Sequence, residues 1–483
     1  MILSTLLKDI PVLEYTADLN TEITGVSYDS RRVETGHLFV AITGYAADGH
    51  RFIPMALDRG AACVLCERKP EGDIPFVRVP DTRVALAMLG ANWYGHPAEK
   101  MTILGVTGTN GKTTVTYLLK SVLEQTLGAK VGLIGTIQNM IGDRVLPTER
   151  TTPESFELQG LFAEMAEAGC THVVMEVSSH ALYLHRVDCI PYAVGAFTNL
   201  TEDHLDFHKT MEAYRKAKAL LFRRCGFSVF NIDDEMVAQT INEAACWALT
   251  LSARGAEADL SATDISLGSD HVSFTANYKG GAWPVRVGIP GGFTVYNALT
   301  VLGMAIGLGI RPAAAVEALG RAEGVKGRLE VVPTPGKDYT VLIDYAHTPD
   351  ALENVLNSVR GFCKGRLIAV FGCGGDRDPI KRPIMGKIGV KLSDLAIITS
   401  DNPRTEEPGK IITDILKGVQ ELNKPYLVVE NRREAIARAM REAKADDVIV
   451  LCGKGHETYQ IIGTEKTHLD EREEVAKQLT IDS

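Results

Sequence analysis

The sequence lacks a hydrophobic run long enough to cross a lipid bilayer. Its longest apolar stretch, residues 299–310, is shorter than the about 20 residues that a membrane-spanning helix needs, so we expect a buried helix there. The N-terminal residues also lack the basic segment, apolar segment and cleavage site of a secretory signal. These absences lead us to expect a cytoplasmic protein with no membrane partner.

The chain has no excess of positive charge either. It carries 51 Lys and Arg against 61 Asp and Glu, which gives a formal net charge of -10. Nucleic acids and anionic membranes are bound by basic surfaces, so we expect neither as a partner. An anionic substrate must then be bound by local arginines and lysines, by backbone amides or by a metal ion.

The nine cysteines are odd in number and scattered, which excludes a regular disulfide framework and indicates a reduced protein. Cys63 and Cys66 form the one close pair. They lie in an apolar run that is typical of a strand, where residues three apart point to opposite faces. We therefore expect no zinc site at this pair.

What the sequence does contain is the alternation of strands and helices that is typical of an α/β protein. Its 483 residues predict two to four domains. A small α/β module ends near residue 99, and a β-branched run beginning at residue 102 opens a second domain. Residues 265–289 alternate apolar and polar side chains, which predicts antiparallel strands at one edge of that domain. Near residue 330 a Pro/Gly turn leads into a third domain, where polar loops follow apolar strands at one sheet edge.

The segment GTNGKTT, residues 108–114, lies between a predicted strand and a predicted helix. A glycine-rich turn there directs backbone amides and the helix N-terminus at an anion, as a phosphate-binding loop requires. The longer GxxxxGK[ST] spacing is not kept, because Val106 occupies its first glycine position. Lys112 is expected to neutralise terminal phosphates and Thr113 to reach Mg²⁺. The ATP-binding candidates of this loop are Gly108, Thr109, Asn110, Gly111, Lys112, Thr113 and Thr114.

Three further candidates remain ambiguous from residue type alone. Glu176 follows an apolar strand and is either a metal ligand or a solvated carboxylate at the strand end. The stretch TNLTEDHLDFH offers His204 and His208 for a metal, but it also fits a polar loop followed by a helix start. Lys218 lies in a helical pattern, where most lysines are simply solvated.

Taken in order along nearly the whole chain, nine motifs resemble the Mur ligases. They are GTNGKTT, TTPE (151–154), MEVSSHALYLHRV, TNLTEDHLDFH, AKALLF, GRLE (327–330), IDYAHTPDAL, GGDRD and GKGHE. The closest likeness is to members that add the third residue of the peptidoglycan stem peptide. The resemblance implies an α/β fold of three domains. A central P-loop mononucleotide-binding parallel sheet (100–330) is flanked by a small N-terminal α/β domain (1–99) and a Rossmann-like C-terminal domain (331–483).

The resemblance implies an ATP-dependent amide ligase. ATP would phosphorylate the D-Glu carboxylate of UDP-N-acetylmuramoyl-L-Ala-D-Glu, and the amine of an incoming amino acid would attack the acyl phosphate. The implied catalytic residues are Lys112, Glu176, His204 and Lys218. Two Mg²⁺ ions are implied, one held by Thr113 and Glu176 and one by His204 with Lys218 as a carbamate.

By the same resemblance, Asn297, Arg328 and Asp344 match positions that contact adenine, phosphates and ribose. Thr294 stands where the family often has Asn, a departure that leaves Asn297 in place.

Ser30 matches a contact to the uridine nucleotide. The positions that hold the muramoyl peptide are matched by Thr151, Thr152, Ser178 and Arg186. Relatives often carry Asn and Gln at two neighbouring positions, where this chain has Arg150 and Leu184.

The motif DNPR, formed by Asp401, Asn402, Pro403 and Arg404, is the form found in family members that add meso-diaminopimelate. Lysine-adding members usually lack its arginine. A guanidinium offers the paired donors that the extra carboxylate of diaminopimelate fits. Arg377, Gly453 and Glu457 match the rest of this pocket, where Glu457 would pair the distal ammonium group.

Three alternatives stay open. One is a lysine-adding member of the family, since the presence of a motif does not by itself determine which substrate is preferred. Folylpolyglutamate synthetase shares the phosphate loop but lacks a full N-terminal uridine-binding module. A regulatory protein that binds nucleotide without turnover would not need both metal positions. We expect a monomer acting on small-molecule substrates.

Overall fold

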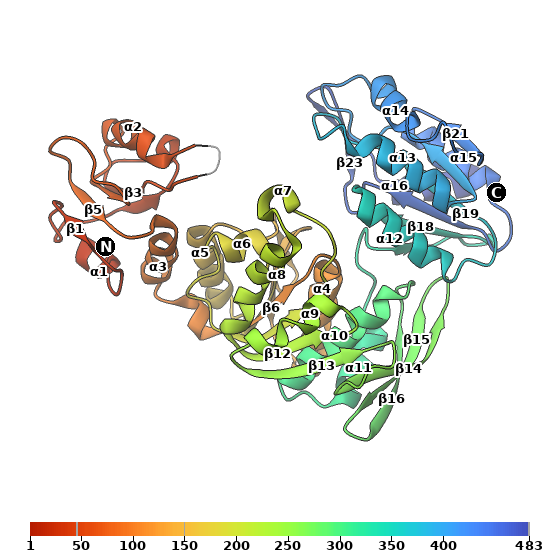
Figure 1. Ribbon diagram of the computed structural model, residues 1–483, viewed down its shortest axis with the longest axis horizontal. Helices are drawn as coiled ribbons and strands as arrows, with labels where there is room; N and C mark the ends of the chain where they lie inside the picture. Colours follow the sequence, from red (N-terminus) through yellow and green to blue (C-terminus); the bar gives the residue numbers. More distant parts are fainter. Residues whose placement is uncertain (45–46, 149, 482–483) are drawn as a thin grey trace. The chain divides into compact units, whose positions relative to one another are not determined.

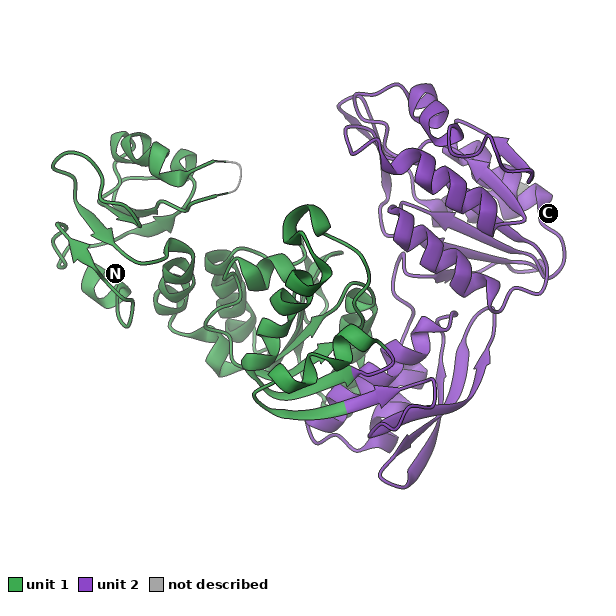
Figure 2. Cartoon of the chain, in the orientation of Figure 1, with its two compact units in different colours: residues 1–230, 234–249 green, residues 231–233, 250–483 purple. Residues whose placement is uncertain are grey.

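The computed structural model describes residues 1–44, 47–148 and 150–481. By its internal contacts the chain divides into two compact units (Figure 2). Unit 1 comprises residues 1–230 and 234–249, and unit 2 comprises residues 231–233 and 250–483. The fold is α/β, as the sequence predicts. No helix within the described ranges is both long and apolar enough to cross a membrane.

The N-terminal part of unit 1 is a five-stranded sheet in the order β1-β5-β4-β3-β2 (Figure 1). Its neighbours pair in parallel except β1 and β5. Its elements are α1 (Leu3–Leu6), β1 (Glu14–Tyr15), β2 (Gly25–Ser27), η1 (Ser30–Arg32), β3 (His37–Val40), η2 (Gly49–Phe52), α2 (Ile53–Asp58), β4 (Cys63–Cys66), β5 (Phe76–Arg78) and α3 (Thr82–Tyr94). Cys63 packs in one hydrophobic cluster and Cys66 in another, so the two thiols lie on opposite faces of β4, as expected.

The second sheet of unit 1 runs in the order β12-β11-β6-β10-β7-β8-β9, and its first five strands are parallel. The strands are β6 (Thr102–Thr107), β7 (Val131–Ile134), β8 (Asn139–Ile141), β9 (Arg144–Leu146), β10 (His172–Glu176), β11 (Tyr192–Phe197) and β12 (Cys225–Asn231). The helices are η3 (Pro97–Lys100), α4 (Lys112–Leu127), α5 (Ser155–Glu167), α6 (Ser179–Tyr183), α7 (Leu205–His208), α8 (Met211–Ala219), η4 (Leu220–Arg223), α9 (Glu235–Ala238) and η5 (Ile241–Glu243). Because the five strands are parallel, the loops that follow β6, β10 and β11 lie at one sheet edge.

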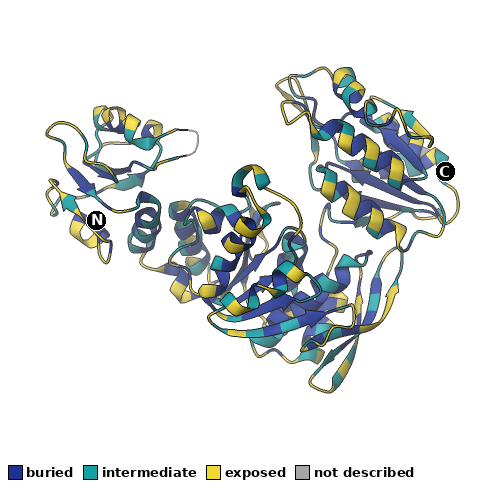
Figure 3. Cartoon of the chain, in the orientation of Figure 1, coloured by how far each residue is buried: buried dark blue, intermediate teal, exposed yellow. Residues whose placement is uncertain are grey.

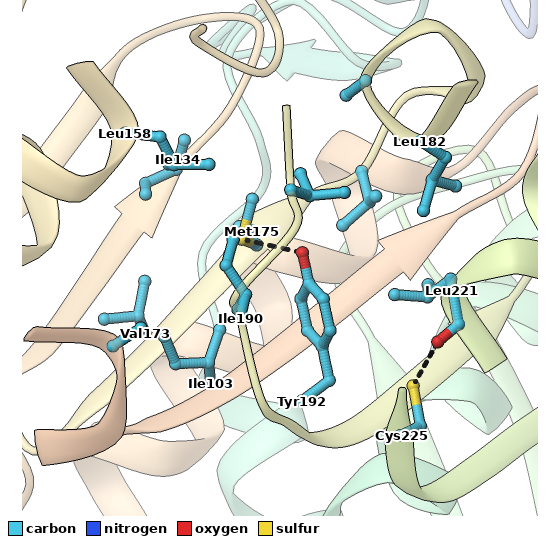
Figure 4. Close-up of a cluster of buried hydrophobic side chains, with 14 of the residues drawn as sticks. Ile103, Ile134, Leu158, Val173, Met175, Leu182, Ile190, Tyr192, Leu221 and Cys225 are labelled. Carbon is cyan, nitrogen blue, oxygen red and sulfur yellow. Dashed lines mark hydrogen bonds between the residues drawn. The ribbon is translucent and has the colours of Figure 1, made fainter. Parts of the chain in front are cut away.

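A buried hydrophobic cluster packs against these parallel strands (Figure 4). Ile103 of β6 and Val173 of β10 are fully buried in it. The Tyr192 hydroxyl donates to Met175 Sδ at 3.6 Å, and burial raises the pKa of this tyrosine well above its ordinary value. The strands are thus held by close packing, which fixes where their carboxyl ends lie.

The chain passes from unit 1 to unit 2 within β13 (Trp247–Ser252). In unit 2 the strands β14 (Leu260–Leu267), β15 (Val272–Tyr278) and β16 (Gly281–Val287) form the predicted antiparallel meander. The helices α10 (Phe293–Gly307) and α11 (Pro312–Arg321) follow. Helix α10 is largely buried, as predicted for the apolar run, although it ends three residues before that run does.

The rest of unit 2 is a six-stranded sheet in the order β17-β18-β22-β19-β20-β21, parallel except for the β17–β18 pair. The strands are β17 (Glu330–Val332), β18 (Thr340–Asp344), β19 (Leu367–Phe371), β20 (Leu395–Ile398), β21 (Tyr426–Val428) and β22 (Val448–Cys452). The helices are α12 (Pro349–Arg360), α13 (Lys381–Leu392), α14 (Pro408–Leu416), α15 (Arg432–Glu442) and α16 (Glu471–Ile481). A separate hairpin pairs β23 (Tyr459–Ile462) with β24 (Glu465–His468).

Helices cover both faces of this six-stranded sheet. Leu342 of β18 packs in one cluster with α12, α13 and α14, whereas its neighbours Val341 and Ile343 pack in another with α15 and α16. Figure 3 shows the consequence, since the inner strands β19, β20 and β22 are buried throughout and the helices alternate buried and exposed residues. The polar loops after β18, β19, β20 and β22 therefore gather at one edge, as the sequence predicts.

Candidate active site

The glycine-rich loop joins β6 to α4, as predicted. The φ of Gly108 is +146°, and a Cβ there would lie 1.9 Å from Thr198 Oγ1, so only glycine fits without rearrangement. Gly111 precedes the helix with a φ of +86°. The loop is tied to the end of β11, because Asn110 N donates to Asn199 Oδ1 at 2.9 Å. This arrangement presents the start of α4 as an anion site.

Two lysines of the predicted site share one acceptor in this loop. Lys112 Nζ donates to the carbonyl oxygens of Gly108 and Thr109, both at 2.9 Å. Lys218 Nζ, on α8, donates to the Gly108 oxygen at 2.8 Å and lies 4.6 Å from the centre of the Tyr214 ring. Lys218 therefore supports the loop. Its side chain is buried, so the alternative that Lys218 is an ordinary solvent-exposed lysine is wrong.

The environment of Lys218 disfavours its charged form. Burial, and then the positive charge of Lys112, hold the pKa of Lys218 well below its ordinary value of 10.5. Only the neutral amine can add CO₂ to form a carbamate. The residue thus has the chemical form that the resemblance requires of it.

Glu176 is the last residue of β10, whereas the sequence suggested that it would follow the strand. Its carboxylate is 1% exposed and accepts two hydrogen bonds from Thr136, from the backbone amide at 2.9 Å and from the hydroxyl at 3.0 Å. In the sheet register Glu176 lies beside Val106 of β6. Thr113, in the first turn of α4, is also buried. The carboxylate of Glu176 is a partnered, buried group, and the solvated alternative is wrong.

His204 caps the start of α7 with a φ of +54°. Its ring lies 4.9 Å from that of His180 and 6.1 Å from that of Tyr214, measured between ring centres. Burial lowers the pKa of His204, which favours the neutral imidazole. His208 is less suited to bind a metal ion, because its Nε2 is already hydrogen-bonded to Ser179 Oγ at 2.9 Å.

The chemistry of Thr113, Glu176 and Lys218 shows whether these side chains could bind magnesium. A threonine hydroxyl and a carboxylate are oxygen donors, which Mg²⁺ prefers. An amine is not, so Lys218 suits a cation only as a carbamate. Within the described ranges no group of three or more His, Cys, Asp or Glu side chains forms a metal cluster by itself. Thr113 and Glu176 fit the ion, and Lys218 fits after modification.

The residues matched to the muramoyl peptide meet around the end of β10. Thr152 Oγ1 donates to the Glu176 carbonyl oxygen at 2.9 Å and accepts from Ser178 N at 3.2 Å. Thr151 Oγ1 lies 3.0 Å from Thr136 Oγ1. These contacts place Thr152 at the backbone of Glu176 and Thr151 beside Thr136, which donates to the Glu176 carboxylate.

The two departures from the family pattern have different surroundings. Arg150 Nη1 lies 2.8 Å from Glu154 Oε1, and Arg186 Nε lies 2.7 Å from the same oxygen. The two arginines therefore share one carboxylate oxygen. Leu184 is buried and packs as a core residue.

Ser30 lies in the N-terminal part of unit 1, at the start of η1, and is 7% exposed. Its hydroxyl lies 3.4 Å from Met55 Sδ. Nearby, the Tyr28 hydroxyl donates to Glu157 Oε1 of α5 at 2.6 Å. This bond ties the expected uridine-binding module to the second sheet of unit 1.

The remaining nucleotide candidates lie in unit 2. Asn297 is buried in α10, and among the described residues its Nδ2 has no hydrogen-bond partner. A buried donor without a partner is costly, which is the property expected of a group that meets a ligand. Asp344 ends β18 and accepts the amides of Leu329 at 2.8 Å and Ala346 at 2.9 Å, while burial raises its pKa. The guanidinium of Arg328 lies 5.3 Å from the centre of the Tyr345 ring.

Arg404 is held in an unusual conformation after β20. Its φ is +52°, a region that non-glycine residues rarely adopt. The hairpin holds it there, because Arg404 N donates to Ile461 O at 3.1 Å and Gly463 N donates to Arg404 O at 2.6 Å. Within the described residues the guanidinium bonds only through Nη1, chiefly to Gly375 O at 2.9 Å. Nε and Nη2 remain for a ligand.

The other pocket candidates surround this arginine. Gly375 N donates to Asn402 O at 2.9 Å, which joins the GGDRD and DNPR loops. Arg377 is exposed beside them. The φ of Gly453 is +116°, and a Cβ there would lie 2.5 Å from Asp401 Oδ2. The structure thus brings Arg377, Arg404 and Gly453 to one edge of the six-stranded sheet.

Sequence reasoning missed Lys454, whose side chain contacts the DNPR loop. Its side chain is fully buried, and its ammonium donates to Asn402 Oδ1 at 3.0 Å and to Tyr459 O at 2.8 Å. It also missed the role of the hairpin. The position of this lysine inside GKGHE, directly after an apolar strand, is the signal that could have identified Lys454.

Comparison with known proteins agrees with the motifs. Three family models match: "Mur ligase family, catalytic domain" at residues 22–94, "Mur ligase middle domain" at 106–305 and "Mur ligase, glutamate ligase domain" at 327–455. A protein of Clostridium acetobutylicum named UDP-N-acetylmuramoyl-L-alanyl-D-glutamate–2,6-diaminopimelate ligase 1 is 49% identical over 480 residues, which cover 99% of both chains.

Two solved structures extend the comparison. One is a UDP-N-acetylmuramoyl-L-alanyl-D-glutamate–2,6-diaminopimelate ligase, 31% identical with a TM-score of 0.74 over 100% of this chain and 99% of the other. The other, the MurF ligase of Thermotoga maritima in complex with ADP, is 20% identical with a TM-score of 0.61 over 97% of this chain and 100% of the other. The second likeness shows the fold alone. From the family models and the 49% identity over 99% of its length, the chain belongs to the Mur ligase family.

Proposed function

We propose that this Mur ligase adds meso-diaminopimelate to the D-Glu carboxylate of UDP-N-acetylmuramoyl-L-Ala-D-Glu in peptidoglycan precursor synthesis. The observation that carries the proposal is the 49% identity over 99% of both chains with a relative named for this reaction. The pocket around Arg404 supports it independently. Folylpolyglutamate synthetase and a non-catalytic regulatory protein have no comparable support.

The reaction follows from the properties of a carboxylate. A carboxylate is a poor electrophile, so ATP first transfers its γ-phosphoryl group to the D-Glu carboxylate and leaves ADP. The resulting acyl phosphate has a good leaving group. The neutral amine of diaminopimelate attacks its carbonyl carbon, and the amide forms as phosphate and a proton leave.

The phosphates of ATP would lie on the loop Gly108–Thr114, where backbone amides and Lys112 stabilise their negative charge. Asn297 would use its buried Nδ2 on the adenine ring, and Arg328 and Asp344 would bind the phosphates and the ribose. The carboxylate of Asp344 already accepts two backbone amides, which holds it in place for a hydroxyl donor.

Magnesium would supply charge screening between the triphosphate and the attacking carboxylate. Thr113 and Glu176 would hold one ion, and His204 with carbamylated Lys218 would hold a second. Lys112 and the loop amides bind and orient the phosphate oxygens, and Thr151, Thr152, Ser178 and Arg186 orient the peptide carboxylate. Ser30 would contact the uridine nucleotide.

Diaminopimelate differs from lysine by a second carboxylate at its far end. Arg404 would receive that carboxylate on Nε and Nη2, which suit a bidentate contact. Glu457 would pair with the ammonium group on the same carbon, and Arg377 and Gly453 would line the pocket. Asp401, Asn402 and Pro403 shape the loop that carries Arg404.

The domain limits 1–99, 100–330 and 331–483 belong to this proposal, with uridine nucleotide, ATP and amino acid bound by the first, second and third. Because unit 2 combines parts of the second and third, limited proteolysis near residues 99 and 330 tests these limits. We further propose a monomer, which sedimentation velocity tests. A cytoplasmic location stays a prediction.

The test of the reaction is phosphate release and product mass from purified protein with ATP, Mg²⁺ and UDP-N-acetylmuramoyl-L-Ala-D-Glu. Diaminopimelate and L-lysine are compared as the amine. A tripeptide product with diaminopimelate and little with lysine is the expected result. A lysine product of equal rate would overturn the specificity, and no product with either would overturn the function.

A further inference from the structure

A buried ammonium group lies between the DNPR loop and the GKGHE turn. Lys454 Nζ is hydrogen-bonded to Asn402 Oδ1 at 3.0 Å and to Tyr459 O at 2.8 Å. Two carboxylates are close as well, Glu457 Oε2 at 3.5 Å and Asp401 Oδ1 at 3.8 Å. The side chain of Lys454 is 0% exposed, whereas that of Glu457 is 14% exposed.

These partners explain why a fully buried lysine is tolerated. An unpaired buried ammonium is costly, and paired carboxylates with hydrogen bonds offset that cost. The same charge acts on Asp401, where burial alone would raise the pKa. Lys454 and then Arg432 outweigh burial and hold the pKa of Asp401 below its ordinary value.

Lys454 determines which way the Asn402 amide faces. The Oδ1 atom accepts from Lys454 Nζ and also from Ile461 N, each at 3.0 Å. A flipped amide would turn its NH₂ group toward these two donors, so the flip is excluded. The NH₂ group must then face Glu457, and Nδ2 donates to Glu457 Oε2 at 2.9 Å.

The orientation of Asn402 in turn determines which oxygen of Glu457 is available. Asn402 Nδ2 and Lys454 Nζ both contact Oε2. Within the described ranges, every hydrogen bond and ion pair of this carboxylate uses Oε2, so Oε1 is left for a ligand. One buried lysine therefore aims one oxygen of a partly exposed carboxylate.

We propose that Lys454 is a positioning residue for the amino-acid substrate. By orienting Asn402 and contacting Glu457, it directs Glu457 Oε1 at the ammonium group on the far carbon of that substrate. The inference rests on the proposed function, since it assumes that Glu457 meets this ammonium group. Lys454 itself touches no substrate atom in this arrangement.

The test uses the full-length protein and the steady-state constants for all three substrates. Lys454→Met keeps the length of the side chain but removes its charge and its donors. We expect the KM for diaminopimelate to rise about 10- to 100-fold, by analogy with groups that orient metal ligands. The KM values for ATP and for the UDP-linked substrate should stay within about twofold. Lys454→Gln, which keeps one donor for Asn402 Oδ1, should recover part of the loss.

Arg366→Met is the matched control. It breaks an ion pair with buried Asp447, 2.8 Å long, at the opposite edge of the same sheet. This variant should lose thermal stability without a selective rise in the KM for diaminopimelate. A Lys454→Met protein that behaves like the control would overturn the positioning role.

A second substitution keeps the inference testable if Lys454→Met does not fold. Asn402→Asp still offers an acceptor to Lys454 and Ile461, but it replaces the donor to Glu457 by a repelling oxygen. It should raise the KM for diaminopimelate selectively. If Lys454 acts through Asn402, the KM of the double variant for diaminopimelate should equal that of the more severe single variant. It should not rise by the product of the two single increases.

The outcomes separate this inference from the proposed function. A wild-type protein that ligates no diaminopimelate overturns the proposed function first. A wild-type protein that does so, with an unchanged KM in Lys454→Met or in foldable Asn402→Asp, overturns only the role of Lys454. Fully multiplicative effects in the double variant would show that Lys454 does not act through Asn402.

Discussion

Lys112 and Lys218 donate to the same carbonyl oxygen, that of Gly108, at 2.9 and 2.8 Å. An ammonium group on each lysine would place two positive charges on one acceptor, and Lys218 is fully buried in addition, so its neutral amine is favoured. Conversion of that amine to a carbamate would place a negative charge beside Lys112, which is an attractive pair. The shared acceptor thus gives a physical reason for the modification that the family resemblance implies.

The first prediction concerns this carbamate. In ¹³C-bicarbonate the wild-type protein should show a carbamate resonance in its NMR spectrum, because the low pKa of Lys218 provides a neutral amine. Lys218→Met should lack the resonance and lose ligase activity by at least ~100-fold, if a metal position is lost. Lys120→Met is the control, since Lys120 is a buried lysine paired with Glu124 at 2.6 Å and should not affect the signal. An unchanged resonance in Lys218→Met would assign the carbamate elsewhere.

The second prediction concerns Gly108, in the loop before α4, and Gly128, directly after α4. Gly108→Ala combines a positive φ with a contact 1.9 Å from Thr198 Oγ1, whereas Gly128→Ala has a positive φ but nothing within 4 Å. Gly128→Ala should cost about 1–2 kcal/mol of unfolding free energy and leave ATP binding intact. Gly108→Ala should cost more and weaken ATP binding by at least ~10-fold, because the loop must shift. Urea unfolding and calorimetric titration with ATP measure both, and equal ATP affinity in the two variants would contradict the assigned role.

The third prediction concerns Arg404. A guanidinium left without its carboxylate partner in a desolvated site costs about 2–5 kcal/mol, and the half-burial of Arg404 favours the low end. Arg404→Ala should therefore reduce the diaminopimelate-to-lysine ratio of kcat/KM by about 30-fold or more. Arg404→Lys keeps the charge but not the paired donors, so it should recover only part of the ratio.

An unchanged ratio in Arg404→Ala would show that the second carboxylate is bound elsewhere. The contrast with Lys454→Met is informative, because that variant acts through an ammonium group that diaminopimelate and lysine share. The ratio should fall in the first variant far more than in the second.

The fourth prediction concerns acid stability. Burial, and then the charges of Arg328 and Arg472, lower the pKa of His456 from 6.5 to about 4. Above pH 6.5 the side chain is neutral in both the folded and the unfolded chain and does not affect stability. Between pH 6.5 and 4 only the unfolded chain binds the proton, so the free energy of unfolding falls as the pH falls.

His456→Gln removes this contribution, so it should lose less stability than the wild type between pH 6.5 and 4. Urea unfolding at several pH values measures the slopes. The two proteins should have parallel profiles above pH 7, which serves as the internal control. Parallel profiles down to pH 4 would contradict the low pKa of His456.

Several features could be predicted because they depend on local pattern. The strand, loop and helix around Gly108–Thr114 follow from a β-branched run, a glycine turn and a helical period. The antiparallel strands β14 to β16 follow from alternating side chains. The predicted end of β10 was wrong by one residue, since hydrogen bonding in the sheet extends this strand to include Glu176.

The sequence by itself determined the α/β class, the phosphate loop and the family, because these depend on residue types at fixed spacings along the chain. Tertiary structure alone decided that Lys218 meets the Gly108 carbonyl 110 residues away. It also decided that Lys454 orients Asn402 across 52 residues and that the hairpin holds the positive φ of Arg404. Burial and partners far apart in the chain set these charges and orientations, and no local pattern carries that information.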